Sequence, residues 1–145
     1  MIKRSAQIHM NQIAHGGDPF ESGSARPLDY GHWVAHKLER MTNQHVLSHG
    51  EAVAIGMCFV AELAGAKIGL SKEIVQSHYE ILKALKLPTS YKKEAWSELL
   101  ITMGLDKKVK SGALRFVAIE SVGKCVRIES PTIDELHASY ERIAQ

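Results

Sequence analysis

The sequence predicts a mainly α-helical fold, a multi-helix domain with one small β-hairpin. Three observations predict it: helix-compatible stretches fill most of the 145 residues, capping and turn residues separate them, and short β-branched runs occur only between residues 114 and 128. A chain of this length holds one ordinary core, so we expect residues 1–145 to form a single domain. With 45% hydrophobic and 23% charged residues, it should be folded rather than disordered.

The first half of the chain is predicted to hold three helices. Residues 3–14 are compatible with a helix, and residues 15–27 are dense in Gly, Pro and Ser, which predicts a loop. A second helix should span residues 30–41, with Asp29 as its N-cap. The third, residues 50–67, is apolar on most sides, so we expect it to be central and largely buried.

Two further helices follow the central one. Gly69 is placed to end the central helix, and Ser71 is placed to cap a helix over residues 72–86. Another helix is expected at residues 92–103 and should stop near Gly104.

The pattern then changes from helical to extended. The runs 114–119 and 124–128 are short and β-branched, with Gly123 between them, which predicts a hairpin. Thr132 followed by Glu135 is a capping box, and it should open a last helix that continues toward residue 145. The total is five or six helices and one hairpin.

The charge and the apolar segments exclude several classes of partner. A formal net charge of +2 is too small to indicate binding to nucleic acid or to a membrane surface. The longest apolar segment, residues 52–66, contains Glu62 and predicts a core helix rather than a membrane span. The first residues lack the apolar run of a signal peptide. We therefore expect a cytoplasmic protein with no membrane partner.

The cysteines and glycines exclude two kinds of site. Cys58 and Cys125 do not form a CxxC pair, so a cysteine-based metal site is not expected, and both should be free thiols. Gly16 and Gly17 lack the spacing of a dinucleotide fingerprint and no βαβ pattern flanks them. This chain should have no cofactor-binding residues for NAD of its own.

Three histidines point to a metal pocket. His32 and His36 are one helical turn apart and share a helix face, and His49 stands just before the central helix. Three imidazoles brought together suit a borderline metal such as zinc. The remaining histidines are expected to be ordinary polar residues: His9, His15, His45, His78 and His137.

Two glutamates could support such a pocket. Glu39 lies at i+3 from His36 and on the same helix face, so it could bind the metal, orient a histidine or face solvent. Glu51 follows His49 by two positions in the first helical turn, where the helix dipole favours a carboxylate. It could also hydrogen-bond to a ligand histidine.

The histidine segments also resemble a known family. Residues 31–39, with the Gly-His pair, the second histidine and the glutamate, and the run HGEAVAIGM at residues 49–57 resemble the C-terminal, metal-binding domain of 3-dehydroquinate synthase, a sugar phosphate cyclase. Residues 3–5, 106–108 and 114–117 agree with that family in order. The resemblance implies a two-domain enzyme. Its N-terminal domain binds NAD, and its C-terminal domain supplies most metal and substrate contacts.

The resemblance also implies a reaction and a set of residues. These enzymes transiently oxidise a sugar-phosphate alcohol, eliminate phosphate, reduce the ketone again and close a carbocycle by aldol addition. His32 and His49 match the family's zinc ligands, for which cobalt is an alternative, and His36 matches a catalytic histidine at the substrate site. Lys107 or Lys108 matches a lysine near the substrate.

Three other positions correspond to substrate contacts of the family, but the residues here differ from the family's. Asn11 stands where the family has a lysine, Arg26 lies one position from an expected arginine, and Asp29 replaces an asparagine. The segment 26–29 resembles the cyclases that act on other sugar phosphates, the epi-valiolone synthase-like branch. The resemblance thus leaves two sugar phosphate substrates open.

The resemblance further implies what this chain does not supply. The family's third metal ligand is a glutamate on a segment before residue 1, and the NAD-binding domain is absent from these 145 residues. NAD would come from a missing domain or an NAD-binding partner chain. Two hypotheses follow: half of a sugar phosphate cyclase, inactive without that domain, or a non-catalytic helical module for binding or oligomerisation. We expect a homo-oligomer in either case.

Overall fold

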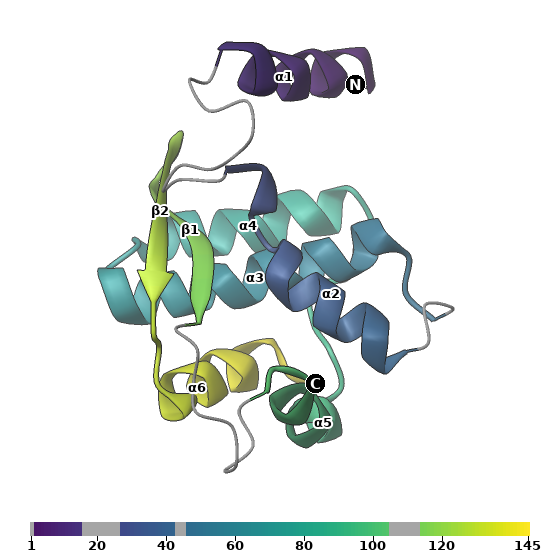
Figure 1. Ribbon diagram of the computed structural model, residues 1–145, viewed down its shortest axis with the longest axis vertical. Coiled ribbons are helices and arrows are strands. Elements are labelled where there is room, and N and C mark those ends of the chain that lie inside the picture. The colour runs from purple at the N-terminus through teal and green to yellow at the C-terminus, as the bar shows by residue number, and fades with distance from the viewer. Residues whose placement is uncertain (1, 16–26, 43–45, 105–113) are drawn as a thin grey trace.

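A long buried helix forms the centre of the fold in the computed structural model (Figure 1). The structure describes residues 2–15, 27–42, 46–104 and 114–145. Its elements are, in order, α1 (Ile2–His15), η1 (Pro27–Asp29), α2 (His32–Met41), α3 (His49–Ile68), α4 (Lys72–Ala84), η2 (Lys93–Ala95), α5 (Trp96–Thr102), β1 (Arg115–Ser121), β2 (Lys124–Glu129) and α6 (Ile133–Ile143). The predicted mainly helical fold with one hairpin is confirmed.

Helix α3 is central because its sequence is apolar on nearly every side. Ten of its 20 residues are buried, and α2, α4, α6 and β1 all pack against it. Ser48 caps its start, and Gly69 ends it in the left-handed conformation with φ 75°. Cys58 lies inside it as a free thiol, and burial raises the pKa of that thiol to about 12. The prediction of a buried central helix is confirmed.

The start of α2 differs from the sequence prediction. Its N-cap is Gly31 with φ 78°, and no side chain caps the helix. Asp29 instead ends η1, and the Tyr30 N–H donates to the Pro27 carbonyl across a tight turn. The predicted cap by Asp29 was wrong because a turn with a left-handed residue separates Asp29 from the helix.

The turn before α2 sits directly on α3. A side chain at Gly56 would overlap the carbonyl oxygen of Gly31, and a Cβ at Gly31 would lie 2.8 Å from the backbone nitrogen of Met57. Glycine at both positions therefore permits contact between the two backbones. The start of α2, with its histidine pair, is fixed against the first half of α3.

The hairpin packs one face on the core. Phe116 on β1 pairs with Ile128 on β2, and both are buried in the core. Val117 pairs with Arg127 on the opposite face, since successive side chains alternate. The capping box predicted after the hairpin is confirmed, because Thr132 and Glu135 exchange both hydrogen bonds at the start of α6.

The predicted helix over residues 92–103 is shorter than expected. Only Trp96–Thr102 is α-helical, and a 3-10 turn precedes it. The Tyr91 N–H donates 3.0 Å to the Ile143 carbonyl, and the Gln145 N–H donates 3.1 Å to the Tyr91 carbonyl. This pairing with the far end of the chain holds the segment extended up to Lys92, which the local sequence could not indicate.

Helix α1 differs from the other helices because none of its residues is buried. Figure 1 shows it apart from the helices that surround α3. Its apolar side chains, among them Ile8 and Met10, are exposed. None of the helices in the described part of the chain combines the length and apolarity needed to cross a membrane.

Candidate metal and substrate site

Three imidazole rings converge between the start of α2 and the start of α3, as predicted. The ring centroids of His32 and His49 lie 5.2 Å apart, those of His36 and His49 5.9 Å, and those of His32 and His36 6.0 Å. The i, i+4 spacing places two rings on one face of α2, and the contact between Gly31 and Gly56 brings the third opposite them.

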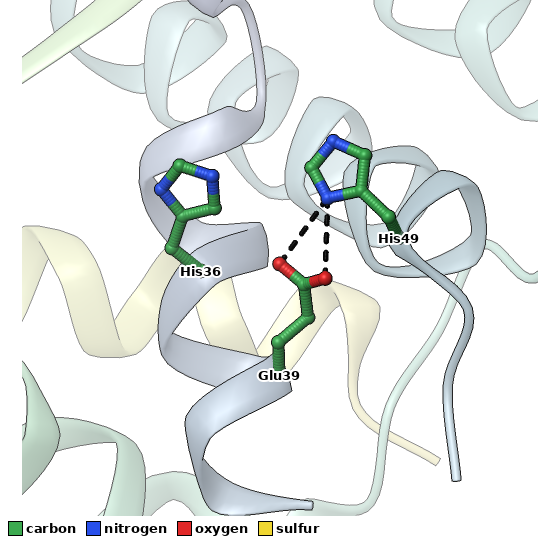
Figure 2. Close-up of side chains that lie close together, drawn as sticks. All are labelled: His36, Glu39 and His49. Carbon is green, nitrogen blue, oxygen red and sulfur yellow. Dashed lines mark hydrogen bonds and ion pairs between the residues drawn. The ribbon is translucent and has the colours of Figure 1, made fainter. Parts of the chain in front are cut away.

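Glu39 holds the ring of His49. Both of its carboxylate oxygens lie 3.2 Å from Nδ1 of His49, as Figure 2 shows. A charged carboxylate only accepts, so Nδ1 carries the proton and donates it. The side chain of Glu39 is 20% exposed and that of His49 54%. This hydrogen bond to a histidine matches one of the roles that the sequence left open for Glu39.

A backbone carbonyl holds the ring of His32 in the same way. Nδ1 of His32 lies 3.2 Å from the carbonyl oxygen of Tyr30, which can only accept a hydrogen bond. In the neutral form of both His32 and His49, therefore, Nδ1 carries the proton and Nε2 keeps its lone pair. No hydrogen bond is formed by either Nε2 within the described residues. Both ring nitrogens of His36 are likewise without a hydrogen bond to any described residue.

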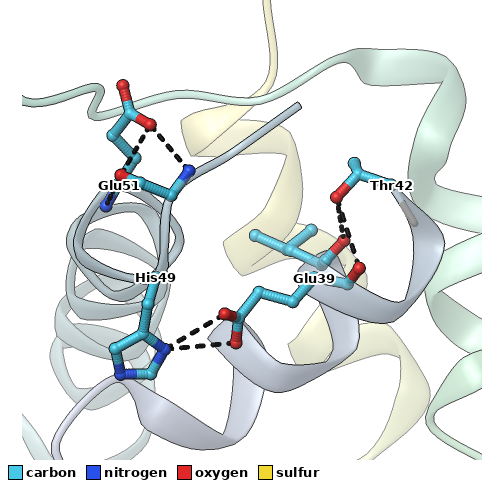
Figure 3. A network of polar contacts seen from close by, with 6 residues as sticks. Glu39, Thr42, His49 and Glu51 are labelled. Atoms are coloured by element: carbon cyan, nitrogen blue, oxygen red, sulfur yellow. Dashed lines mark hydrogen bonds and ion pairs between the residues drawn. The ribbon is translucent and has the colours of Figure 1, made fainter. Parts of the chain in front are cut away.

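Glu51 does not contact a histidine. Its carboxylate accepts hydrogen bonds from the backbone N–H and the hydroxyl of Ser48, at 2.8 and 2.7 Å (Figure 3). These two hydrogen bonds lower the pKa of Glu51. Its role in the structure is to complete the capping box of α3, which fixes the first turn on which His49 stands.

The donor set is compatible with a first-row metal ion. One ligand atom each from His36, Glu39 and His49 lies within 4.8 Å of the others. Donors that share a tetrahedral zinc ion lie about 3.4 Å apart, so a small side-chain adjustment would bring them to that spacing. Imidazole nitrogens suit zinc and cobalt. Of the two predicted metal ligands, His49 belongs to this group, whereas His32 does not, although its ring lies 5.2 Å from that of His49.

A cleft of about 350 Å³ opens beside the histidines. His32 and His36 line it from α2, and Arg115 and Arg127 line it from the outer face of the hairpin. Asp29 also lines this cleft. The cleft thus places two guanidinium groups near the candidate metal residues, an arrangement suited to an anionic ligand.

The other predicted substrate residues lie elsewhere or outside the described part. Asn11 is exposed on α1, where it accepts a hydrogen bond of 2.8 Å from Gln7, and it does not line the cleft. Arg26, Lys107 and Lys108 lie outside the described residues. Sequence reasoning missed both cleft arginines. The alternation of the hairpin, with Phe116 inward, could have placed Arg115 and Arg127 on one face.

Comparison with known proteins agrees with this geometry. The family described as 3-dehydroquinate synthase C-terminal matches residues 1–109, which include His32, His36, Glu39 and His49. The chain belongs to the 3-dehydroquinate synthase C-terminal family. The family resemblance seen in the two histidine segments is thereby confirmed.

Relatives of the chain carry the name 3-dehydroquinate synthase. The protein of Corynebacterium glutamicum is 43% identical over 145 residues, and that of Corynebacterium diphtheriae is 41% identical over 144 residues. Each alignment covers 99% of this chain and 39% of the relative. The protein of Nocardia farcinica is 38% identical over 145 residues, covering 100% of this chain and 38% of the relative. The chain thus spans about two fifths of the length of these 3-dehydroquinate synthases.

A solved structure has the same fold. It is the crystal structure of 2-deoxy-scyllo-inosose synthase complexed with carbaglucose-6-phosphate, NAD+ and Co2+. The TM-score is 0.62 at 24% sequence identity, and the match covers 86% of this chain and 37% of that one. The described fold is therefore that of a dehydroquinate synthase-like C-terminal domain.

Proposed function

We propose that the chain is the metal- and substrate-binding part of a 3-dehydroquinate synthase-like sugar phosphate cyclase, in which His32 and His49 bind Zn2+ or Co2+. One observation carries the proposal. In both histidines Nδ1 donates to an oxygen, so each presents Nε2, with its lone pair, as the metal ligand. Glu39 then acts on the metal through His49 by fixing the orientation of its ring.

The residues of the site divide the chemistry between them. His32 and His49 would hold the metal ion, which when bound would supply Lewis-acid chemistry to the oxygen of the substrate that is oxidised. His36 lies on the same face of α2, and its ring nitrogens are without hydrogen bonds in the described part of the chain. It can therefore accept and return a proton at the substrate. Lys107 or Lys108 would bind an anionic group of the substrate.

The cleft binds the sugar phosphate. Arg115 and Arg127 provide positive charge for a phosphate or carboxylate, although Arg115 also lies 3.6 Å from Glu129. Asp29 is placed to accept hydrogen bonds from sugar hydroxyls, and Arg26 and Asn11 are the remaining proposed contacts. The names of the relatives favour the 3-dehydroquinate synthase substrate over that of the epi-valiolone synthase-like branch.

A cobalt titration tests the metal site. Bound Co2+ absorbs visible light, so the isolated chain can be titrated and its dissociation constant measured. The variant His32→Ala/His49→Ala should bind at least about 100-fold more weakly, because two of the nitrogen donors are gone. His9→Ala, which removes an exposed histidine on α1, is the matched control and should bind like the wild type. Equal affinity of wild type and double variant contradicts the metal assignment.

An activity assay tests whether catalysis requires an NAD-binding domain in addition to this chain. The transient oxidation needs a nicotinamide, and the sequence holds no fingerprint for one. The isolated chain should release no phosphate from a sugar phosphate when NAD+ and Zn2+ are added. Release should appear when an NAD-binding domain, with its metal-binding glutamate, is supplied in the same chain or in trans. Phosphate release that depends on this chain alone would contradict the proposal.

One observation favours the second candidate, a non-catalytic module for binding or oligomerisation. Helix α1 exposes its apolar side chains, with Ile8 60% and Met10 64% exposed. An uncovered apolar face promotes self-association. Sedimentation analysis of the isolated chain should then show a concentration-dependent homo-oligomer. Ile8→Ser/Met10→Ser should shift it to the monomer, and an unshifted variant speaks against this face.

A further inference from the structure

Tyr30 is held at its side chain by a histidine from a distant helix. Its hydroxyl lies 2.7 Å from Nε2 of His78 on α4. Nδ1 of the same histidine lies 2.7 Å from the carbonyl oxygen of Ile74, which can only accept. His78 therefore carries its proton on Nδ1 and accepts the Tyr30 hydroxyl at Nε2. Burial raises the pKa of the Tyr30 phenol, so this hydroxyl stays a donor.

The backbone of Tyr30 is held as firmly as its side chain. The next residue, Gly31, contacts Gly56 of α3 so closely that no side chain fits between them. Between these two anchors stands the carbonyl of Tyr30, the group that accepts the proton of His32 Nδ1 at 3.2 Å. Tyr30 thus connects two sets of hydrogen bonds: its hydroxyl contacts His78, which is held by the Ile74 carbonyl, and its own carbonyl contacts a proposed metal ligand.

We propose that His78 and Tyr30 are positioning residues for His32. They fix the carbonyl that selects the tautomer of His32 and the direction of its Nε2. Neither touches the metal or the substrate, so both act through the ring of His32. The inference rests on the metal role proposed for that histidine. It also gives a function to His78, which the sequence indicated only as an ordinary polar residue.

The expected effect is a loss of metal affinity without a loss of ligands. Removing a hydrogen-bond partner behind a metal-binding histidine weakens binding by about 10- to 100-fold. Tyr30→Phe and His78→Ala lie one step further back, so about tenfold is expected for each. His78→Gln should restore most of the affinity, because its amide oxygen can accept the Tyr30 hydroxyl in place of Nε2.

Cobalt titration of the full chain measures these affinities. Tyr79→Phe is the matched control. Like Tyr30→Phe it removes a hydrogen-bonded hydroxyl, but Tyr79 lies on α4 and donates 2.8 Å to Glu62. It should leave Co2+ binding unchanged. Two results overturn the inference: Tyr30→Phe and His78→Ala binding Co2+ like the wild type, or Tyr79→Phe weakening it equally. In either case, loss of binding in His32→Ala/His49→Ala would leave the proposed function standing.

A metal-free measurement tests the same inference if the isolated chain binds no Co2+. Long-range proton–nitrogen NMR reports which ring nitrogen of a histidine carries the proton. In the wild type, His32 should show the Nδ1–H tautomer. Tyr30→Phe and His78→Ala should shift it toward Nε2–H, and Tyr79→Phe should not. A His32 tautomer that is the same in all four proteins overturns the positioning role.

Discussion

Helix α3 carries a polar cluster near each end, and the two differ in how completely their atoms are bonded. The histidine cluster at the start consists of His32, His36, Glu39 and His49. The Glu62 cluster near the end consists of Glu62, Tyr79 and Arg142. In the latter, the Tyr79 hydroxyl and the Arg142 guanidinium each donate to a different oxygen of Glu62, at 2.8 and 3.1 Å.

The difference separates a structural cluster from a binding cluster. The Glu62 side chain is 13% exposed, and each of its oxygens already accepts a hydrogen bond from another helix. The His49 side chain is 54% exposed, and its Nε2 forms no hydrogen bond with any described residue. Saturated polar groups hold elements together, whereas accessible lone pairs held in one direction are available to a ligand.

The largest expected effect on stability comes from a side chain placed between the backbones of Gly31 and Gly56. Gly56→Ala should lower the free energy of unfolding by about 3 kcal/mol, because the new methyl group meets the Gly31 carbonyl and neither backbone can move away easily. It should also weaken metal binding by displacing the start of α2. Gly50→Ala, which has open space, is the control and should stabilise α3 by up to about 1 kcal/mol. Urea unfolding measures both, and equal stabilities would contradict the prediction.

The next effect separates the two clusters directly. Glu62→Ala should lower the free energy of unfolding by about 2 kcal/mol, because the Tyr79 hydroxyl loses its acceptor in a half-buried position. Metal affinity should not change. His49→Ala should do the reverse, with stability altered by less than about 0.5 kcal/mol and metal affinity lost. Urea unfolding and cobalt titration of both variants measure the two quantities. A variant that changes both stability and metal affinity would contradict the separation.

A separate effect, on metal affinity rather than on stability, is expected at the carboxylate that contacts His49. Glu39→Ala should weaken Co2+ binding by about 100-fold and Glu39→Gln by about tenfold, since the amide oxygen can still accept from Nδ1 but carries no charge. If Glu39 bound the metal itself, the two variants would lose affinity equally. The ratio of the two dissociation constants therefore decides between orientation and ligation.

The smallest effect concerns the cap beneath His49. Ser48→Ala should lower the free energy of unfolding by about 1 kcal/mol, because α3 loses its N-cap hydrogen bond. Hydrogen bonds from Ser48 lower the pKa of Glu51, so the stabilisation from the charged carboxylate is present above the ordinary carboxyl pKa. It is lost as the pH falls through the lowered value. The gap between wild type and variant should narrow in acid, and a constant gap would contradict this.

Local signals in the sequence predicted most of the fold. The caps at Ser71 and Thr132 and the left-handed end at Gly69 are confirmed, because each depends on residues within one turn. Asp29 was wrong as a cap, since a glycine in the left-handed conformation begins α2. The start of the predicted helix at residue 92 was wrong because its neighbour Tyr91 pairs with the chain's last residues.

The site likewise contains some residues that local sequence patterns predicted and others that they did not. The spacing of His32 and His36 predicted a shared face, and the motif beginning at His49 predicted the third ring beside them. The contact between Tyr30 and His78 joins residues 48 positions apart, and no periodicity connects such positions. A pattern along the chain reports which face a residue occupies, but partners from distant elements require the packed structure.

The close packing of α2 on α3 has a consequence for the order of folding. The members of the histidine cluster all lie between residues 32 and 49, so only a short stretch of chain must close to bring them together. Arg142 is 80 positions from Glu62 and reaches it only once α6 has docked. We expect the metal-binding atoms to meet early in folding and the Glu62 cluster to close late. Metal ions present during folding would then bind a helical hairpin before the rest of the domain has formed around it.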